Sequence, residues 1–406
     1  MNFDIFLSIC QNEVDGFIPS EKQMFENFFS QVKLADRLGF KTAWVAETHL
    51  SCQVQKRNPF AVIPDFKGEI GLNTDILQLS HLVYAQTQQI KMGSAIRNIL
   101  CNGGPIAHAE ALKTFATLHS MQASADRKFE WGFASGRFPF SNIPFGIRPR
   151  SKTESVAWKA LTGRIFLQAT EIFMRLIKGE EIASKDVTPI ALKPEHFRSE
   201  EDWQKALDVY KAEGGSGGKE IPIPSFWQFD EVGVIPFDAP LELINFTIGA
   251  HWREAHELAN KYHPCGVFNL SITPPEVIEA THNYMKEVYN PAGGAWNRSL
   301  MPRTVLVFVS NDPKLSIEEN NKKAREMATK ANQSYMTAIQ GTIDPVRIAM
   351  AVDNALAGHP ETILQQVKER FHPEDRLMLW FDFNNHNGTE VEEAMKVFME
   401  QVAPNL

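Results

Sequence analysis

The chain has 406 residues, of which 43% are hydrophobic and 22% charged, a composition typical of globular proteins that excludes disordered and collagen-like chains. The 41 basic and 49 acidic residues give a net charge of −8 without basic runs, which argues against nucleic-acid binding. The four cysteines form no CxxC spacing, which favours a reducing, cytoplasmic location and no metal site. No window holds the roughly 18 apolar residues that a membrane helix needs, so we expect no membrane anchor.

Short apolar runs alternate with helical patterns along the chain, which is typical of βα units around a parallel sheet. Residues 3–9 form the first apolar run, and residues 24–38 then carry apolar side chains at helical spacing before Gly39. Further strands are predicted at 42–46, 90–96, 129–134, 241–248, 267–272, 304–310 and 376–383. Further helices are predicted at 75–86, 105–121, 154–177, 252–262, 275–289, 317–340, 360–371 and 390–402. Eight strands, each followed by a helix, predict a single α/β domain over residues 1–406, a (β/α)₈ TIM barrel.

Two segments interrupt this rhythm and are interpreted as insertions. Residues 51–73 are polar and contain prolines, and they are too long for an ordinary connection. Residues 178–240 contain charged stretches, a short helix predicted at 200–212, and the apolar and aromatic segment IPIPSFWQF. Because such barrels bind ligands at the carboxyl ends of their strands, we expect both insertions to lie over this mouth.

Polar residues follow the second predicted strand, where chemistry is expected in a barrel of this kind. Glu47 and His49 stand there, and the imidazole of His49 titrates near neutral pH, as an acid or base must. The two side chains are therefore candidates for catalysis. A structural pair in the barrel mouth is the competing interpretation.

The order of several motifs resembles that of the bacterial luciferase-like flavin-dependent monooxygenases. The motifs are LADRLGFKTAWVAETHL (34–50) with a downstream Asn-Pro (58–59), KMGSAI (91–96) followed by HAEALKTF (108–115), DRKFEWGFASGRFPF (126–140) with Phe-Gly (145–146), INFTIGAHWREAHELANKYHPCGV (244–267), AGHPETILQQV (357–367) and the closing segment 376–406. The resemblance covers most of the chain. It implies a barrel that takes reduced FMN from a separate flavin reductase and reacts it with O₂.

In such enzymes a flavin C4a-peroxide oxygenates a small organic substrate, and the protein positions and shields the flavin. The resemblance implies that Ser94, Ala95 and Ile96 lie beneath the isoalloxazine ring, with a cis peptide bond between Ala95 and Ile96. It also implies that Ala134 lies near the flavin C4a atom, where its small side chain leaves room for the peroxide.

The same resemblance implies a phosphate site built from residues after the fourth and fifth strands. Thr247, Gly249 and Ala250 would present hydroxyl and N–H groups to the FMN phosphate at a helix N-terminus. Arg137 would be the counter-charge, although a surface salt bridge is the alternative for this residue. Ser135 would contact the flavin and not act as a nucleophile, because no Gly-x-Ser-x-Gly elbow surrounds it.

One position departs from the family pattern. Relatives that oxidise aldehydes usually have Glu-His-His after the second strand, whereas this chain has Thr48 in place of the first histidine. Aldehyde oxidation with light emission is therefore not expected. Two alternatives to the monooxygenase stay open: a hydride-transfer oxidoreductase that uses a flavin or deazaflavin, and a catalytically silent flavin-binding partner subunit. Relatives commonly form dimers, so a homodimer or heterodimer is expected.

Overall fold

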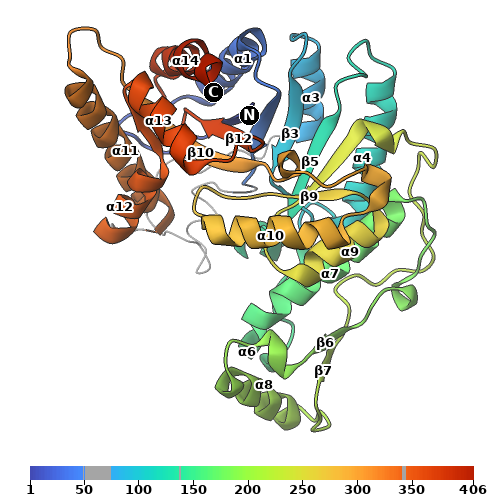
Figure 1. Cartoon of the computed structure of the whole chain (residues 1–406). Helices are drawn as coiled ribbons and strands as arrows, with labels where there is room; N and C mark the ends of the chain where they lie inside the picture. Colours follow the sequence, from blue (N-terminus) through green and yellow to red (C-terminus); the bar gives the residue numbers. More distant parts are fainter. Residues whose placement is uncertain (49, 51–74, 137–138, 341–343) are drawn as a thin grey trace.

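The computed structural model describes residues 1–48, 50, 75–136, 139–340 and 344–406. Within these residues, eight parallel strands form the barrel sheet (Figure 1). They are β1 (Asn2–Leu7), β2 (Thr42–Ala46), β3 (Lys91–Ala95), β5 (Phe129–Ala134), β8 (Ile244–Ile248), β9 (Cys265–Val267), β10 (Arg303–Val309) and β12 (Arg376–Trp380). The predicted α/β barrel is confirmed, and each predicted strand is present. The strands at 42–46 and 129–134 have the predicted bounds, and the other six have shifted ends. The short strand β11 (Leu356–Gly358), which pairs with β10, was not predicted.

Hydrogen bonds between neighbouring strands run around the barrel in the order β10, β12, β1, β2, β3, β5, β8 and β9. The circle is completed at Asn269, just after β9. Its N–H donates to the Pro302 carbonyl at 2.9 Å, and its own carbonyl accepts from the Thr304 N–H at 3.0 Å. The two-residue strand β4 (Arg97–Asn98) continues β3 beyond Ile96 and pairs with β5.

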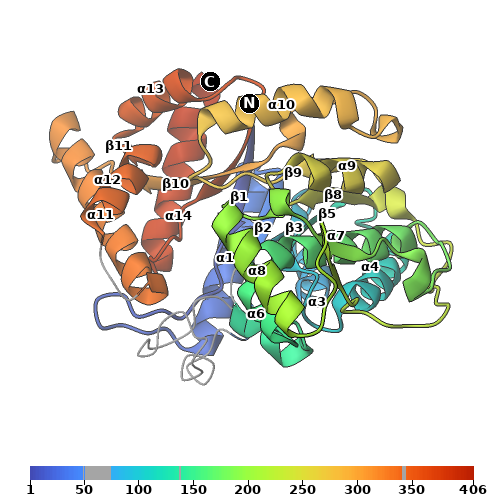
Figure 2. The ribbon, with the colours of Figure 1, turned by 90° about the horizontal axis from the view of Figure 1, so that it is seen from below.

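Helices surround the strands on the outside of the barrel (Figure 2). The described helices are α1 (Glu21–Leu38), α3 (Ile76–Tyr84), α4 (Gly104–Ser120), α5 (Pro139–Asn142), α6 (Lys152–Val156), α7 (Trp158–Ile177), α8 (Glu200–Ala212), α9 (Arg253–Tyr262), α10 (Pro275–Val288), α11 (Ile317–Gln340), α12 (Pro345–Asn354), α13 (Pro360–Arg370) and α14 (Gly388–Val397). Local sequence explains their ends. In α1, the Ser20 side chain accepts from the Gln23 N–H at the start, and Gly39 adopts a left-handed conformation at the end. Every helix in the described part of the chain is too short or too polar to cross a lipid bilayer.

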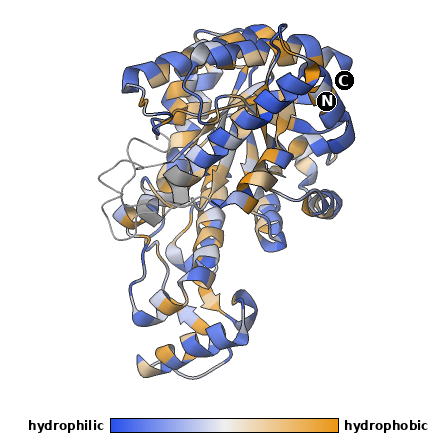
Figure 3. Cartoon of the chain, turned by 90° about the vertical axis from the view of Figure 1, so that its left-hand side faces the viewer, coloured by the Kyte–Doolittle hydropathy of each residue, from blue (hydrophilic) through white to orange (hydrophobic). Residues whose placement is uncertain are grey.

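The alternation of side chains along each strand separates the barrel interior from the core beneath the helices. In β12, Leu377 and Leu379 pack in the hydrophobic core under the helices, whereas Arg376, Met378 and Trp380 point into the barrel. Hydrophobic residues accordingly gather in the strands, and the outer faces of the helices are hydrophilic (Figure 3). Side chains at the ends of the inward-facing rows are the ones that reach the mouth.

Residues 178–240 form an arm that extends away from the barrel (Figures 1 and 3). The arm contains the antiparallel pair β6 (Ile190–Leu192) and β7 (Ile221–Ile223), and its helix α8 packs against α6. The predicted helix at 200–212 is confirmed. The arm returns towards the mouth at Phe226, whose ring centroid lies 3.7 Å from Arg150 Cζ. The other predicted insertion, 51–73, lies outside the described residues.

Candidate active site

A buried ion pair joins the ends of β2 and β4. Arg97 Nη1 lies 3.0 Å from Glu47 Oε2, and the Ser94 hydroxyl donates to Glu47 Oε1 at 2.5 Å. The Glu47 side chain is 0% exposed. Both of its oxygens therefore accept hydrogen bonds inside the protein, and the carboxylate is enclosed and does not face an open cavity.

His108 of α4 supports this ion pair from behind. Its Nε2 lies 3.1 Å from the Asn98 carbonyl oxygen and 3.0 Å from the Cys101 carbonyl oxygen. Because carbonyl oxygens only accept hydrogen bonds, Nε2 carries the proton and Nδ1 accepts from Arg97 Nε at 3.5 Å. His108 thus orients Arg97, and the group Glu47, Ser94, Arg97 and His108 forms one network beside the mouth.

Three of the predicted flavin contacts lie together at the mouth. The peptide bond between Ala95 and Ile96 is cis, as the resemblance implies. A Cβ atom added to Gly249 would lie 2.6 Å from Ile96 Cδ1 and 3.2 Å from Ala134 Cβ. Ile96, Ala134 and Gly249 are therefore close neighbours, and a larger residue at position 249 would fill the space between them.

An apolar floor closes the barrel below these residues. It consists of the buried side chains of Phe6, Trp44, Ala95, Phe268 and Met378, with Ala46, Ile96 and Trp380 packed on them and partly exposed at the mouth. Such a surface suits a planar aromatic ring, which gains from apolar burial and from contact with other aromatic rings.

A cavity of about 990 Å³ opens beside the mouth, between the segment after β5 and the start of α7. Ser135 and Gly136 line it, together with Asn142 and the exposed side chain of Arg148. Asn142 fixes this edge, since its Nδ2 donates to the Ser135 carbonyl at 3.1 Å and its Oδ1 accepts from Asn98 Nδ2 at 2.6 Å. The cavity combines a cation with hydroxyl and amide groups, which are the partners that a phosphate takes.

The structure corrects the predicted position of Thr247. This residue lies within β8, and its buried side chain lines a separate cavity of about 790 Å³ at the amino end of the barrel. Helix α9 begins only at Arg253, so Thr247 is not at a helix N-terminus. Trp252, just before the helix, has an extended backbone, and the Ala250 carbonyl accepts from His256 Nε2 at 2.8 Å.

Asp382, which the sequence analysis did not single out, is buried just beyond β12 on the inward-facing row of Met378 and Trp380. Its Oδ2 accepts from the Ser8 N–H at 2.8 Å, whereas its Oδ1 has no hydrogen-bond partner among the described residues. Burial raises the pKa of this carboxyl to about 7, against the hydrogen bonds from Ser8 and Trp380 that lower it. The sequence did contain a signal for this residue. In the segment WFDF (380–383), Asp382 has the same parity as Met378 and Trp380, so strand alternation places its side chain on the inward face.

Comparison with known proteins relates this geometry to a family. Residues 1–184 match the family model of the luciferase-like monooxygenases. Over this part of the chain, the sequence is similar to that family. The matched segment runs from β1 to seven residues beyond α7, and so contains Glu47, Ala95, Ile96 and Ala134. The resemblance predicted from the sequence is confirmed there.

Solved structures with the luciferase-like fold extend the similarity to the whole chain. A monooxygenase from Streptomyces bottropensis has a TM-score of 0.65 and 18% identity, over 100% of this chain and 99% of that chain. The oxygenating constituent of 3,6-diketocamphane monooxygenase from the CAM plasmid of Pseudomonas putida, in complex with FMN, has a TM-score of 0.57 and 15% identity, over 100% and 98%. An F420-dependent secondary alcohol dehydrogenase has a TM-score of 0.53 and 13% identity, over 100% and 99%. At these identities the likeness shows the fold. The search of curated protein sequences finds no match.

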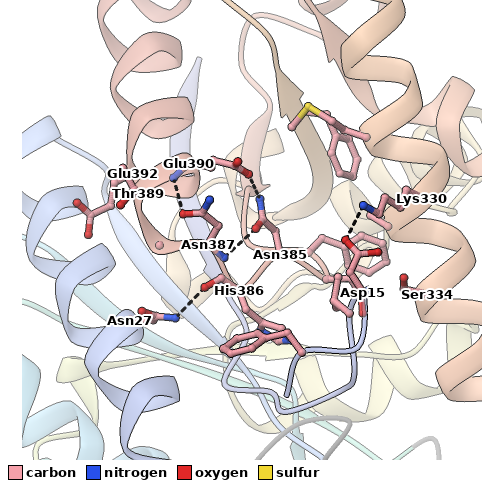
Figure 4. A pocket seen from close by; sticks show the side chains of 18 of the residues that line it. Asp15, Asn27, Lys330, Ser334, Asn385, His386, Asn387, Thr389, Glu390 and Glu392 are labelled. Carbon is pink, nitrogen blue, oxygen red and sulfur yellow. Dashed lines mark hydrogen bonds and ion pairs between the residues drawn. The ribbon is translucent and has the colours of Figure 1, made fainter. Parts of the chain in front are cut away.

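Another cavity of about 770 Å³ lies between α1, α11 and α14 (Figure 4). Polar groups dominate the side chains labelled there. Lys330 of α11 pairs with Asp15 at 2.5 Å, and Asn27 Nδ2 donates to the His386 carbonyl at 3.3 Å. The His386 ring itself turns to the Asn12 carbonyl, 2.7 Å from its Nε2. These polar groups are largely paired with one another.

Two predicted site residues, His49 and Arg137, lie outside the described residues. The acid–base and phosphate roles expected of them therefore stay predictions. The described part of the chain contains no group of three or more His, Cys, Asp or Glu side chains that could hold a metal ion.

Proposed function

We propose that the protein is a flavin-dependent monooxygenase that uses reduced FMN and O₂ to oxygenate a small organic substrate. The observation that carries the proposal is the apolar floor at the mouth, which lies next to the cavity lined by Ser135, Gly136 and Arg148. One part of this surface suits a flat ring and the other a phosphate, as FMN requires. When bound, reduced flavin supplies the electrons and activates O₂.

The residues around the mouth would hold the flavin in distinct ways. Ala95, Ile96 and Gly249 would lie against the ring, and Ala134 would leave room above it. Arg148, in place of the predicted Thr247, would bind the phosphate, and Arg137 would be a second cation. The network of Glu47, Ser94, Arg97 and His108 would fix the strand ends beneath the ring, so we propose a positioning role for Glu47. The predicted catalytic role of His49 remains part of the proposal.

We propose that a separate reductase supplies the reduced flavin, because the sequence has no Gly-x-Gly-x-x-Gly fingerprint after a strand for a nicotinamide. We also propose a dimer and a single barrel domain whose insertions cover part of the mouth. The contact of Phe226 with Arg150, beside the cavity, supports this cover for the insertion 178–240. The three described cysteines are unpaired, in keeping with a cytoplasmic location.

The test is an anaerobic titration of the purified protein with photoreduced FMN, followed by rapid mixing with oxygenated buffer. A monooxygenase is expected to bind the reduced flavin and to reoxidise it more slowly than free flavin reoxidises. Replacing His49 by Ala should leave FMN affinity unchanged and slow oxygenation by about 10²- to 10⁴-fold, as loss of an acid–base group does. Failure to bind any reduced flavin would refute the proposal.

A hydride-transfer oxidoreductase is the second candidate, because the fold is shared with an F420-dependent secondary alcohol dehydrogenase. Such an enzyme would reduce bound flavin or deazaflavin with an alcohol under anaerobic conditions, whereas a monooxygenase requires O₂. A silent partner subunit would bind reduced FMN and reoxidise it as fast as free flavin. Reoxidation rate and anaerobic reduction therefore separate the three possibilities.

A further inference from the structure

We propose that Asp382 holds the proton that the reaction with O₂ consumes. This inference rests on the proposed function. Anionic reduced flavin, O₂, substrate and one proton give oxidised flavin, oxygenated product and water. Without substrate, anionic reduced flavin, O₂ and one proton give oxidised flavin and hydrogen peroxide. In both reactions the flavin gives two electrons to O₂, and in the oxygenation the substrate gives two more. Each reaction also consumes one proton, which must come from the protein or from solvent.

The backbone places Asp382 at the mouth. In β12, Met378 and Trp380 point into the barrel and belong to the apolar floor, and Asp382 continues this row two residues further on. Ser8, the residue after the neighbouring strand β1, lies beside it. The Ser8 N–H donates to Asp382 Oδ2 at 2.8 Å, and Trp380 Nε1 donates to the Ser8 hydroxyl at 2.8 Å.

The surroundings of the Asp382 carboxyl favour its protonated form. Asp382 is only 7% exposed, and its Oδ1 has neither a hydrogen-bond partner nor an ion-pair partner among the described residues. A buried carboxylate without a cation is unstable, and protonation removes the charge. Its titratable neighbour is Cys10, on the segment after β1, whose thiol pKa is raised to about 12 by burial and by Asp382. Cys10 therefore adds no charge at neutral pH.

Three other described acid–base groups near the mouth, Glu47, His108 and His386, are committed elsewhere. Glu47 accepts from Ser94 and Arg97, so both of its oxygens are engaged by these side chains. His108 directs its protonated Nε2 at two backbone carbonyls. His386 directs Nε2 at the Asn12 carbonyl, and burial lowers its pKa. Asp382, in contrast to these three groups, combines a position at the mouth with a buried carboxyl oxygen that has no partner among the described residues.

The first measurement follows the carboxyl itself in the flavin-free protein. Aspartate side chains labelled with ¹³C are titrated by NMR in the wild type, in Asp382→Asn and in the surface control Asp353→Asn. The asparagine keeps the shape of the side chain and an oxygen for the Ser8 N–H. We expect one signal that titrates near pH 7, which Asp382→Asn removes and Asp353→Asn retains. A signal of Asp382 that titrates at the ordinary aspartate pH would overturn the assignment.

The second measurement follows single-turnover reoxidation of bound, photoreduced FMN between pH 5 and 9, without substrate. We expect an inflection near pH 7 in the wild type, and in Asp382→Asn a rate about 10²-fold lower without that inflection. FMN affinity should change less than twofold. If wild-type protein binds no reduced FMN, the proposed function fails. If FMN binds and Asp382→Asn keeps the wild-type pH profile, only the role of Asp382 fails, and loss of the inflection in His49→Ala would then assign the proton to His49.

Discussion

Replacing Gly136 by Ala tests whether the edge of the proposed phosphate cavity is built as described. Gly136 has a φ of +73°, in the left-handed region, and an added Cβ would lie 2.6 Å from Asn98 Cγ, with Asn98 Nδ2 closer still. The methyl group would force the Asn98 side chain to move. That side chain donates to Asn142 Oδ1 at 2.6 Å and accepts from the Leu100 N–H at 3.0 Å.

The expected loss of stability has two parts. A left-handed conformation costs an alanine about 1 kcal/mol. Displacing the buried Asn98 side chain breaks two hydrogen bonds and strands polar groups, which adds about 2 kcal/mol. Gly146 is a matched control, because its φ is +82° and an added Cβ meets no atom of the described residues within 4 Å. Gly146→Ala should therefore lose only about 1 kcal/mol, and Gly136→Ala about 3 kcal/mol.

Urea unfolding of the two variants measures the difference in their free energies of unfolding. A titration with FMN then measures whether the cavity still binds the flavin. Gly136→Ala should also weaken FMN binding, whereas Gly146→Ala should not. In the Asn98→Ala background the extra loss from Gly136→Ala should disappear, because its clash partner is gone. Equal losses for Gly136→Ala and Gly146→Ala, within about 0.5 kcal/mol, would refute the steric reasoning.

The remaining predictions concern buried charges and the phosphate. Arg376→Met leaves the carboxylates of Asp4 and Glu130, which Arg376 binds at 2.6 and 3.1 Å, without a cation. Urea unfolding should therefore show that the free energy of unfolding falls by about 3–5 kcal/mol. The control Arg325→Met, at an exposed ion pair, should lower it by less than about 1 kcal/mol. The pKa of Asp382 rises from 3.8 to about 7 on folding, so between these pH values the folded state binds more protons than the unfolded state. The free energy of unfolding should therefore fall by about 4 kcal/mol as the pH rises from 3.8 to 7, and Asp382→Asn should remove this fall. Arg148→Ala should weaken FMN about 10- to 100-fold while riboflavin binding is unchanged, and Thr247→Val should not discriminate between the two; calorimetric titration decides both.

The barrel could be predicted because its strands carry a strong signal. Parallel strands with helices on the outside are buried on both faces, and so appear as short apolar runs such as residues 129–134 and 303–309. The boundary of α8 was also predictable, since Ser199 caps it and acidic residues fill its first turn. β11 was missed because three residues, Leu-Ala-Gly, are too few to show a period.

The site was only partly predictable, because sequence spacing does not give the direction of a side chain. Glu47 and Ser94 were placed at strand ends correctly, but their burial against Arg97 depends on contacts between different strands. Thr247 precedes a helix in the sequence, yet the strand alternation turns it into the barrel interior. Arg148 was not predicted, because only the folded path of the segment after β5 brings it to the cavity.

The barrel interior contains two buried aspartates in different electrostatic settings, which explains why one is structural and the other is assigned a proton. Asp4, near the amino end, accepts from Trp44 Nε1 at 2.7 Å and from Arg376 Nε at 2.6 Å. Burial raises the pKa of Asp4, whereas the Arg376 cation and the Trp44 indole N–H oppose this rise, so removing Arg376 should destabilise the fold. Asp382, at the mouth, has only neutral donors around it, so its charge is removed most easily by a proton. The same strand pair, β1 and β12, therefore supports the fold at one end and supplies an acid at the other.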